Sequence, residues 1–321
     1  MDINQINPFA RRESHGAAAI LWYRLLTVVS WALAVAVTVY HTFEAPHGHH
    51  KHPGRTIWDQ NRAHPSGFTL NSIIASVYWI SLFVLQLGYV ARLFSPNPEA
   101  VYAACCVGSH FILHNLLHSA FVALFVHSRF VLAELVLLVN FFNLSALYFR
   151  HTTRPTKQQT QEAGQQQQQQ QQQPSATTGR GVALLRLVTI HLPAVSGPLA
   201  WTFVAIYWNG AIMVPHQNSL PARILANVFV WSILGYGSFF LLFYRDYTMG
   251  FSLSVLAAAL AVGQFLRQII ALQWIFGFSI MAVLFVLSLA VALPEWAGVN
   301  VSWPREVDER APLLAEPRNE E

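Results

Sequence analysis

Residues 101–126 read VYAACCVGSHFILHNLLHSAFVALFV, a stretch without a charged side chain. A helix of about 20 apolar residues crosses the hydrocarbon core of a bilayer, so this stretch predicts a transmembrane helix. Seven other stretches are of comparable length and almost as apolar: 17–40, 73–93, 130–148, 182–214, 224–244, 251–266 and 271–293. The sequence therefore predicts an all-α, polytopic transmembrane bundle of eight helices.

The boundary between the last two helices needs a separate argument. As one helix, residues 251–293 would be about 64 Å long, roughly twice the thickness of the hydrocarbon core. A turn must therefore divide this stretch. Arg267 and Gln268 form its polar pair, so we place the turn there.

The composition excludes several classes of protein. Hydrophobic residues make up 54% of the 321 residues and charged residues 11%, whereas soluble domains contain about 25% charged residues. The 19 Lys and Arg residues are scattered between the apolar stretches, so we expect no binding of nucleic acid. No nucleotide-binding or hydrolase motif occurs in a suitable context. We therefore expect no cofactor and favour a role without enzymatic activity.

Lys and Arg are unevenly divided between the two sides of the predicted bundle. Twelve lie at the N-terminus, in the tail and in the second, fourth and sixth loops, and six lie on the opposite side. Cytoplasmic segments are enriched in these residues, so both termini are expected in the cytosol. The predicted parts are a cytosolic N-terminus (1–16), a first four-helix group (17–148) with a His-rich luminal loop (41–72), a cytosolic loop (149–181), a second four-helix group (182–293) and a cytosolic tail (294–321).

Three histidines, His110, His114 and His118, occupy the third predicted helix. Their spacing of four residues places them on one helical face, which should point into the bundle because polar groups in lipid are costly. All three cannot bind one metal ion, because the outer two are about 12 Å apart along the helix axis. We interpret the row first as interhelical hydrogen bonding. A proton or transport path and a metal site are the alternatives.

Few other side chains that can carry a charge lie within the predicted spans. Glu134 and Arg267 are at the same predicted depth near the luminal end, so an ion pair between them is expected. Glu134 is also the group that, with His114 and His118, a membrane-embedded enzyme would use. In the fifth helix, the prolines and glycine between residues 193 and 198 should kink or break the helix and free backbone carbonyls.

The predicted luminal loop holds a second group of histidines. They are His47, His49, His50 and His52. Imidazole is a ligand of first-row transition metals, so one interpretation is a weak zinc or copper site. The other is a set of solvated side chains without a metal. An acidic lumen would favour the second, because protonated imidazole does not bind metal.

Two polar segments lie on the predicted cytosolic side. The loop contains Gln165–Gln173, which cannot bury apolar surface and is expected to be disordered. In the tail, Glu309 precedes the pair Leu313 and Leu314 by four residues, which is the pattern of an acidic dileucine sorting signal. A sorting adaptor would hold the acidic side chain on a basic patch and the leucines in an apolar pocket. An adaptor and the lipid bilayer are therefore the expected partners.

Six short segments carry a family resemblance: Asn7–Ser14, Val107–Leu113, Asn140–Ser145, Gly197–Phe203, Tyr207–Gly210 and Asp246–Phe251. They resemble a fungal family of uncharacterised multi-pass membrane proteins, a domain of unknown function with a member at the vacuolar membrane. The resemblance implies a multi-pass helical fold and a vacuolar location. It implies no activity and no catalytic residue.

The features above support one leading function and two alternatives. We expect an integral vacuolar-membrane protein with a transporter-like role for a small solute or ion. A non-catalytic scaffold or assembly factor is the first alternative, in which the buried polar residues are structural. A membrane-embedded enzyme that uses His114, His118 and Glu134 is the second.

The dileucine pattern gives a direct prediction about location. Changing Leu313 and Leu314 to Ala removes the apolar anchor of the signal, so the protein should be diverted from the vacuole to the plasma membrane or endosomes. Fluorescence microscopy of the tagged protein measures this redistribution. Undisturbed delivery to the vacuole would show that the address lies elsewhere in the chain.

Overall fold

The computed structural model describes residues 16–46, 54–152, 185–214, 219–267 and 273–297. Within these residues the chain is helical and forms no strand. The helices are α2 (Ala17–Phe43), α3 (Ile57–Ala63), α4 (Ser72–Leu93), α5 (Pro98–Val126), α6 (Phe130–Thr152), the π-helix η1 (Leu187–Ser196), α9 (Gly197–Met213), α10 (Leu220–Phe229), α11 (Trp231–Tyr244), α12 (Tyr247–Arg267) and α13 (Gln273–Ala297).

Eight helical segments are long and apolar enough to cross a membrane, which confirms the predicted polytopic bundle. The π-helix η1 continues into α9 as one such segment, and α10 continues into α11 as another. Helix α12 ends at Arg267, the first residue of the predicted polar pair, and α13 begins at Gln273. The predicted Gln tract, the His-rich part of the luminal loop and the dileucine tail lie outside the described residues.

Polar capping residues explain why several helices begin earlier than hydropathy predicted. Helix α5 begins at Pro98 because the side chain of Asn97 accepts a hydrogen bond from the backbone N–H of Glu99. Helix α12 begins at Tyr247, where hydropathy placed residue 251, because Asp246 accepts the backbone N–H groups of the first turn. Hydropathy averaged along the sequence does not detect these capping residues, although they determine where a helix can start.

The predicted interruption of the fifth span is a π-helix that runs on into α9. Pro193 has no backbone N–H to donate, and the Gly197 N–H bonds to the carbonyl of Leu192, five residues earlier. Side chains of α4 use the carbonyls of this irregular segment. Gln86 Nε2 donates to the Pro193 carbonyl at 3.2 Å, and Tyr78 Oη donates to the Gly197 carbonyl at 2.7 Å.

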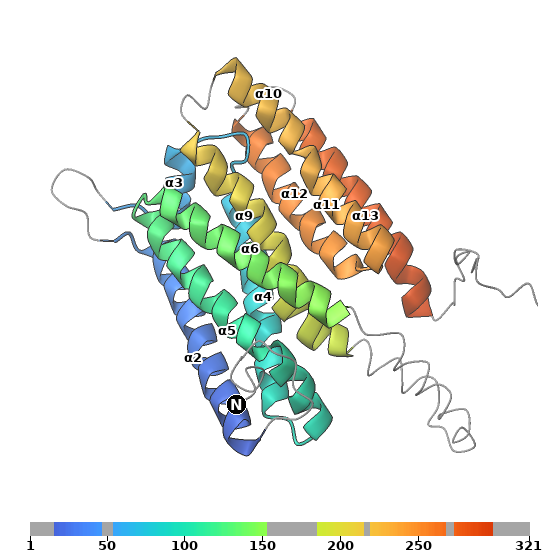
Figure 1. Ribbon diagram of the computed structural model, residues 1–321. Helices are drawn as coiled ribbons and strands as arrows, with labels where there is room; N and C mark the ends of the chain where they lie inside the picture. The colour runs from blue at the N-terminus through green and yellow to red at the C-terminus, as the bar shows by residue number, and fades with distance from the viewer. Residues whose placement is uncertain (1–15, 47–53, 153–184, 215–218, 268–272, 298–321) are drawn as a thin grey trace, which may run out of the picture.

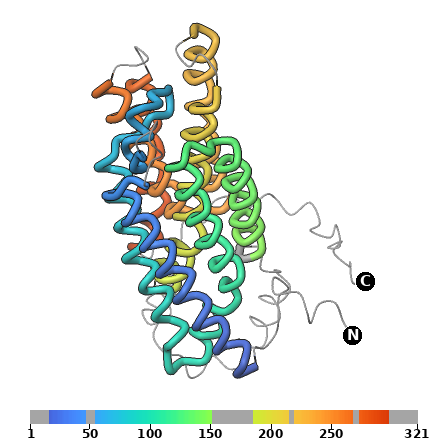
Figure 2. The backbone as a smooth tube through the Cα atoms, turned by 90° about the vertical axis from the view of Figure 1, so that its left-hand side faces the viewer, coloured from blue at the N-terminus to red at the C-terminus, as the bar shows by residue number. Residues whose placement is uncertain are grey.

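The spans form one bundle, although the long loop after α6 divides them in sequence. The fifth span packs against α4 and α6, and α12 packs against α4 and α9. Figure 1 shows α2, α5 and α6 on one side and α11, α12 and α13 on the other, with α4 and α9 between them. The start of α2 and the end of α13 lie at the same end of the bundle, and α10 projects beyond its neighbours at the other end (Figures 1 and 2).

Large apolar side chains cover the outer faces of the helices. Leu21 and Trp22 on α2 and Leu242 and Phe243 on α11 are among those more than half exposed. A protein with such an apolar surface would be unstable in water, whereas a bilayer accommodates this surface. The side chains that are fully buried between helices include Tyr89, Phe111, Phe125, Trp208 and Phe240.

Segment 66–71, which leads into α4, lies directly on α12. The backbone N–H of Asn71 donates to the Ala259 carbonyl at 2.8 Å, and Gln264 Nε2 donates to the Ser66 carbonyl at 2.9 Å. This contact requires a glycine at position 263. A Cβ there would lie 2.5 Å from the Thr69 carbonyl oxygen, which is backbone and cannot move aside freely.

We therefore predict that Gly263→Ala destabilises the protein by about 1–3 kcal/mol, the usual cost of overpacking. The matched control is Gly235→Ala on α11, because nothing lies within 4 Å of a Cβ at that position. The control should be neutral or stabilising by up to about 1 kcal/mol, since alanine favours a helix. Thermal unfolding in detergent, followed by tryptophan fluorescence, measures both. Equal midpoints for the two variants would contradict the proposed close contact.

Candidate functional site

The three histidines of α5 are buried and form hydrogen bonds with neighbouring helices. His110 Nδ1 donates to Asn143 Oδ1 on α6 at 2.8 Å, and Asn143 Nδ2 donates back to the His110 carbonyl at 3.0 Å. One turn along, Asn140 is hydrogen-bonded to His114 Nδ1, which lies 3.0 Å from Asn140 Nδ2 and 3.2 Å from Asn140 Oδ1. The asparagines are three residues apart on α6, so both face the histidine row.

His118 is placed differently from the other two. Its Nε2 is hydrogen-bonded to Thr38 Oγ1 on α2 at 3.0 Å, and the ring of Trp79 stacks on it with 4.1 Å between ring centroids. The rings of His114 and His118 have centroids 6.1 Å apart. The row therefore joins α5 to α6 at two levels and to α2 at a third.

The row is not arranged as a metal site. Among the described residues, no group of three His, Cys, Asp or Glu side chains could hold a metal ion. The other candidate ligands, His47, His49, His50 and His52, lie outside the described residues. The geometry of the row fits interhelical hydrogen bonding, and the asparagine partners were not identified from the sequence.

A cavity of about 450 Å³ lies beside His118, between α2, α3, α4, α5 and α9. We call it the His118 cavity. Its lining is mainly apolar and aromatic. Phe43 on α2 and Ile73 and Ile80 on α4 belong to the lining and are between 62% and 78% exposed, so the cavity opens on the outer surface between these helices.

Two tryptophans of the His118 cavity have unsatisfied donors. The indole Nε1 atoms of Trp58 and Trp201 are buried and have no hydrogen-bond partner. A buried N–H without an acceptor costs free energy, about 1–3 kcal/mol in proteins. Both N–H groups are closed off from solvent, and the rings of the two tryptophans belong to the mainly apolar and aromatic lining of the cavity.

Glu134 lies in a different place from the histidine row. It lines a second cavity of about 310 Å³ between α6, α9 and α10, which we call the Glu134 cavity. The expected ion pair with Arg267 is wrong, because Asn209 Nδ2 donates to Glu134 Oε2 at 2.7 Å and Arg267 Nη1 donates to the Asn61 carbonyl at 3.1 Å. His118 and Glu134 thus border separate cavities, and His114 borders neither.

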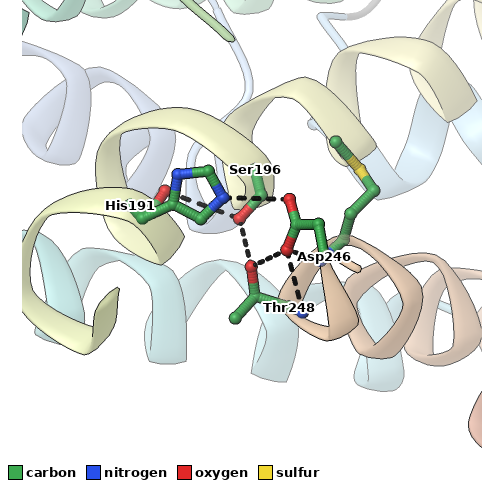
Figure 3. Close-up of polar contacts among 5 residues, drawn as sticks. His191, Ser196, Asp246 and Thr248 are labelled. Atoms are coloured by element: carbon green, nitrogen blue, oxygen red, sulfur yellow. Dashed lines mark hydrogen bonds and ion pairs between the residues drawn. The ribbon is translucent and has the colours of Figure 1, made fainter. Parts of the chain in front are cut away.

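A further polar cluster joins η1 to the start of α12 (Figure 3). His191 Nε2 and Asp246 Oδ2 are 2.9 Å apart, and Thr248 Oγ1 donates to Asp246 Oδ1. Ser196 and Thr248 are linked through their hydroxyl groups at 2.7 Å. The sequence did not predict this cluster, because His191 and Asp246 are 55 residues apart and belong to different parts of the bundle.

The electrostatics of this cluster favour an ionised carboxylate. Burial alone would raise the pKa of Asp246. The charge of His191, together with hydrogen bonds from His191, Thr248 and the Met249 backbone, outweighs burial and lowers this pKa to about 2. The cluster is enclosed and caps a helix, so its evident role is to fasten η1 to α12.

The pKa of Asp246 leads to a prediction about acid stability. Because it lies below the ordinary value of 3.8, the ionised carboxylate stabilises the fold above that pH by about 2 kcal/mol, and this contribution disappears as the pH falls toward 2. Asp246→Asn should therefore be less stable than the parent at pH 7, with a difference that shrinks between pH 4 and pH 2.

Chemical denaturation in detergent at several pH values measures this difference. Glu99→Gln is the control, because Glu99 is exposed at the start of α5. A constant difference between Asp246→Asn and the parent at every pH would show that packing, and not the charge of Asp246, stabilises the cluster.

The chain has one match among known protein families. Residues 223–314 match a family described as a fungal protein of unknown function (DUF1774). The matched part includes most of α10, all of α11, α12 and α13, and Asp246–Phe251 among the segments that carried the resemblance. Neither a curated protein nor a solved structure matches the chain significantly. The match supports a relationship to this fungal family through the last three membrane-spanning segments.

Proposed function

We propose that this chain is an integral protein of the vacuolar membrane that takes a small amphipathic molecule from the bilayer and moves it across. The observation that carries the proposal is the His118 cavity. Its volume of about 450 Å³ lies within the range of about 300–1,000 Å³ that is usual for small-molecule sites. Its opening lies on an apolar surface, so a molecule dissolved in lipid can reach it without crossing water.

The lining supports an amphipathic ligand over a small polar solute. The walls are mainly apolar and would bind a hydrocarbon body by the hydrophobic effect. Trp58 and Trp201 place aromatic rings against such a body. Thr38 and His118 add a hydroxyl and an imidazole at the inner wall. A single-chain lipid with an ester or phosphate oxygen has this combination of groups.

The histidine row supports movement of the ligand as well as binding. From His118 it runs along α5 through His114 to His110, away from the cavity. Buried polar groups at successive levels of a span are typical of transport and proton paths. The π-helix η1 lies in the neighbouring span, and such segments occur often at functional sites.

The vacuolar part of the proposal rests on the sequence. The resemblance to a family with a vacuolar-membrane member and the dileucine pattern at Glu309, Leu313 and Leu314 favour the same organelle. A sorting adaptor that binds the cytosolic tail belongs to this proposal.

Quenching of tryptophan fluorescence tests binding in the His118 cavity. Trp58, Trp79, Trp201 and Trp208 line it, so a lysophosphatidylcholine with a brominated chain should quench their emission in nanodiscs. Ser76→Trp places a bulky ring in the cavity and should weaken this quenching at least tenfold. Trp201→Phe keeps an aromatic side chain but replaces the indole by a smaller phenyl ring, so it should weaken the quenching severalfold. Equal quenching in the parent and in Ser76→Trp would contradict a ligand in this cavity.

Proteoliposomes test movement across the bilayer. A lysophosphatidylcholine carrying a nitrobenzoxadiazole group is bleached by external dithionite only when it reaches the outer leaflet. The parent should speed this bleaching, and Ser76→Trp should not. Replacing His110 and His114 together by Leu leaves the lining of the cavity unchanged, so quenching should persist while movement slows. Binding without movement in the parent would indicate a scaffold regulated by lipid.

A further inference from the structure

The Glu134 cavity presents one charged side chain to an otherwise largely apolar space. It lies between α6, α9 and α10, and the segment 66–68 also lines it. Gly210 on α9 stands opposite the carboxylate, and a Cβ at that position would lie 3.5 Å from Glu134 Oε1. Because Gly210 has no side chain, the carboxylate is open to the cavity.

No basic side chain among the described residues neutralises Glu134. The ion pairs found there join Arg62 to Asp59 and His191 to Asp246. A carboxylate held away from water without a positive charge is costly. The negative charge of Glu134 is therefore balanced only by a proton on its carboxylate or by a cation in the cavity.

Asn209 holds the carboxylate in place from behind the cavity. Asn209 is fully buried, and its Nδ2 donates to Glu134 Oε2 and to the Phe130 carbonyl, at 2.7 and 2.9 Å. Asn209 does not itself line the cavity, whereas Glu134 does. The bond from Asn209 therefore orients the carboxylate, and Glu134 Oε1 is the oxygen on the side of Gly210.

The remaining walls suit an organic cation. Phe68 and Tyr207 are stacked with ring centroids 5.2 Å apart, and the ring of Phe229 is 6.2 Å from that of Tyr207. All three line the cavity. Aromatic faces attract ammonium groups, and apolar walls bind a hydrocarbon body better than a hydrated inorganic ion.

We propose that the Glu134 cavity binds a small organic cation, a protonated amine with an apolar body, for which Glu134 is the counter-ion. The rings of Phe68, Tyr207 and Phe229 surround the rest of the molecule. This site is separate from the His118 cavity and does not depend on the function proposed for it.

Isothermal titration calorimetry with the full chain in nanodiscs tests the site. The probe is benzylammonium, and benzyl alcohol is the neutral molecule of the same shape. The parent should bind benzylammonium at least tenfold more tightly than benzyl alcohol. Glu134→Gln keeps the bond from Asn209 but removes the charge, so it should abolish this preference. Gly210→Val fills the space in front of the carboxylate and should weaken binding of benzylammonium at least tenfold.

Controls separate this proposal from misfolding and from the first cavity. Gly235→Val carries the same change at an open position of α11 and should bind like the parent. Ser76→Trp should block lipid quenching in the His118 cavity but leave benzylammonium binding unchanged. Three results would overturn the proposal: equal binding in the parent and Glu134→Gln, unchanged binding in Gly210→Val, or displacement of benzylammonium by millimolar Na⁺ or K⁺, which would indicate an inorganic cation.

Discussion

The structure depends on one constraint, which is that polar groups in a bilayer core must find their partners within the protein. The irregular fifth span illustrates it. Pro193 disturbs the helical hydrogen bonds, and Gln86 and Tyr78 of α4 donate to the carbonyls of the disturbed segment. The asparagines of α6 do the same for His110 and His114. Helix neighbours in this bundle are thus specified by polar contacts as well as by apolar packing.

The same constraint bears on the two cavities. The carboxylate of Glu134 borders a largely apolar cavity with no basic partner among the described residues, and Asn209 donates to one of its oxygens. At the His118 cavity, Thr38 and His118 are hydrogen-bonded to each other within a mainly apolar wall. Buried atoms without a partner also occur away from the cavities, as at His114 Nε2, so a polar group at the wall of a cavity of suitable size is what marks these two sites.

The sequence predicted those parts of the fold that depend on a single helix. Apolar length predicted the eight spans, and the spacing of four predicted that the histidines share a face. Among features that depend on two helices, the hydrogen bonds of the histidine row fit the first interpretation, although their partners were not identified, and other pairings were missed or wrong. The equal predicted depth of Glu134 and Arg267 in the membrane suggested an ion pair between them, but Arg267 donates to the Asn61 carbonyl. The pairing of His191 with Asp246 leaves no periodic signal in the sequence.

The fifth span connects the three polar regions of the molecule. Its π-helical part holds His191 and Ser196, which are fastened to α12 through Asp246 and Thr248. Its α-helical part, α9, is a wall of both cavities: Trp201 and Trp208 line the His118 cavity, and Tyr207 and Gly210 line the Glu134 cavity. Since Trp208 and Gly210 are only two residues apart on one rigid helix, a rotation of α9 would change both cavities at once. The Asp246 cluster, which anchors the other end of this span, restrains such a rotation.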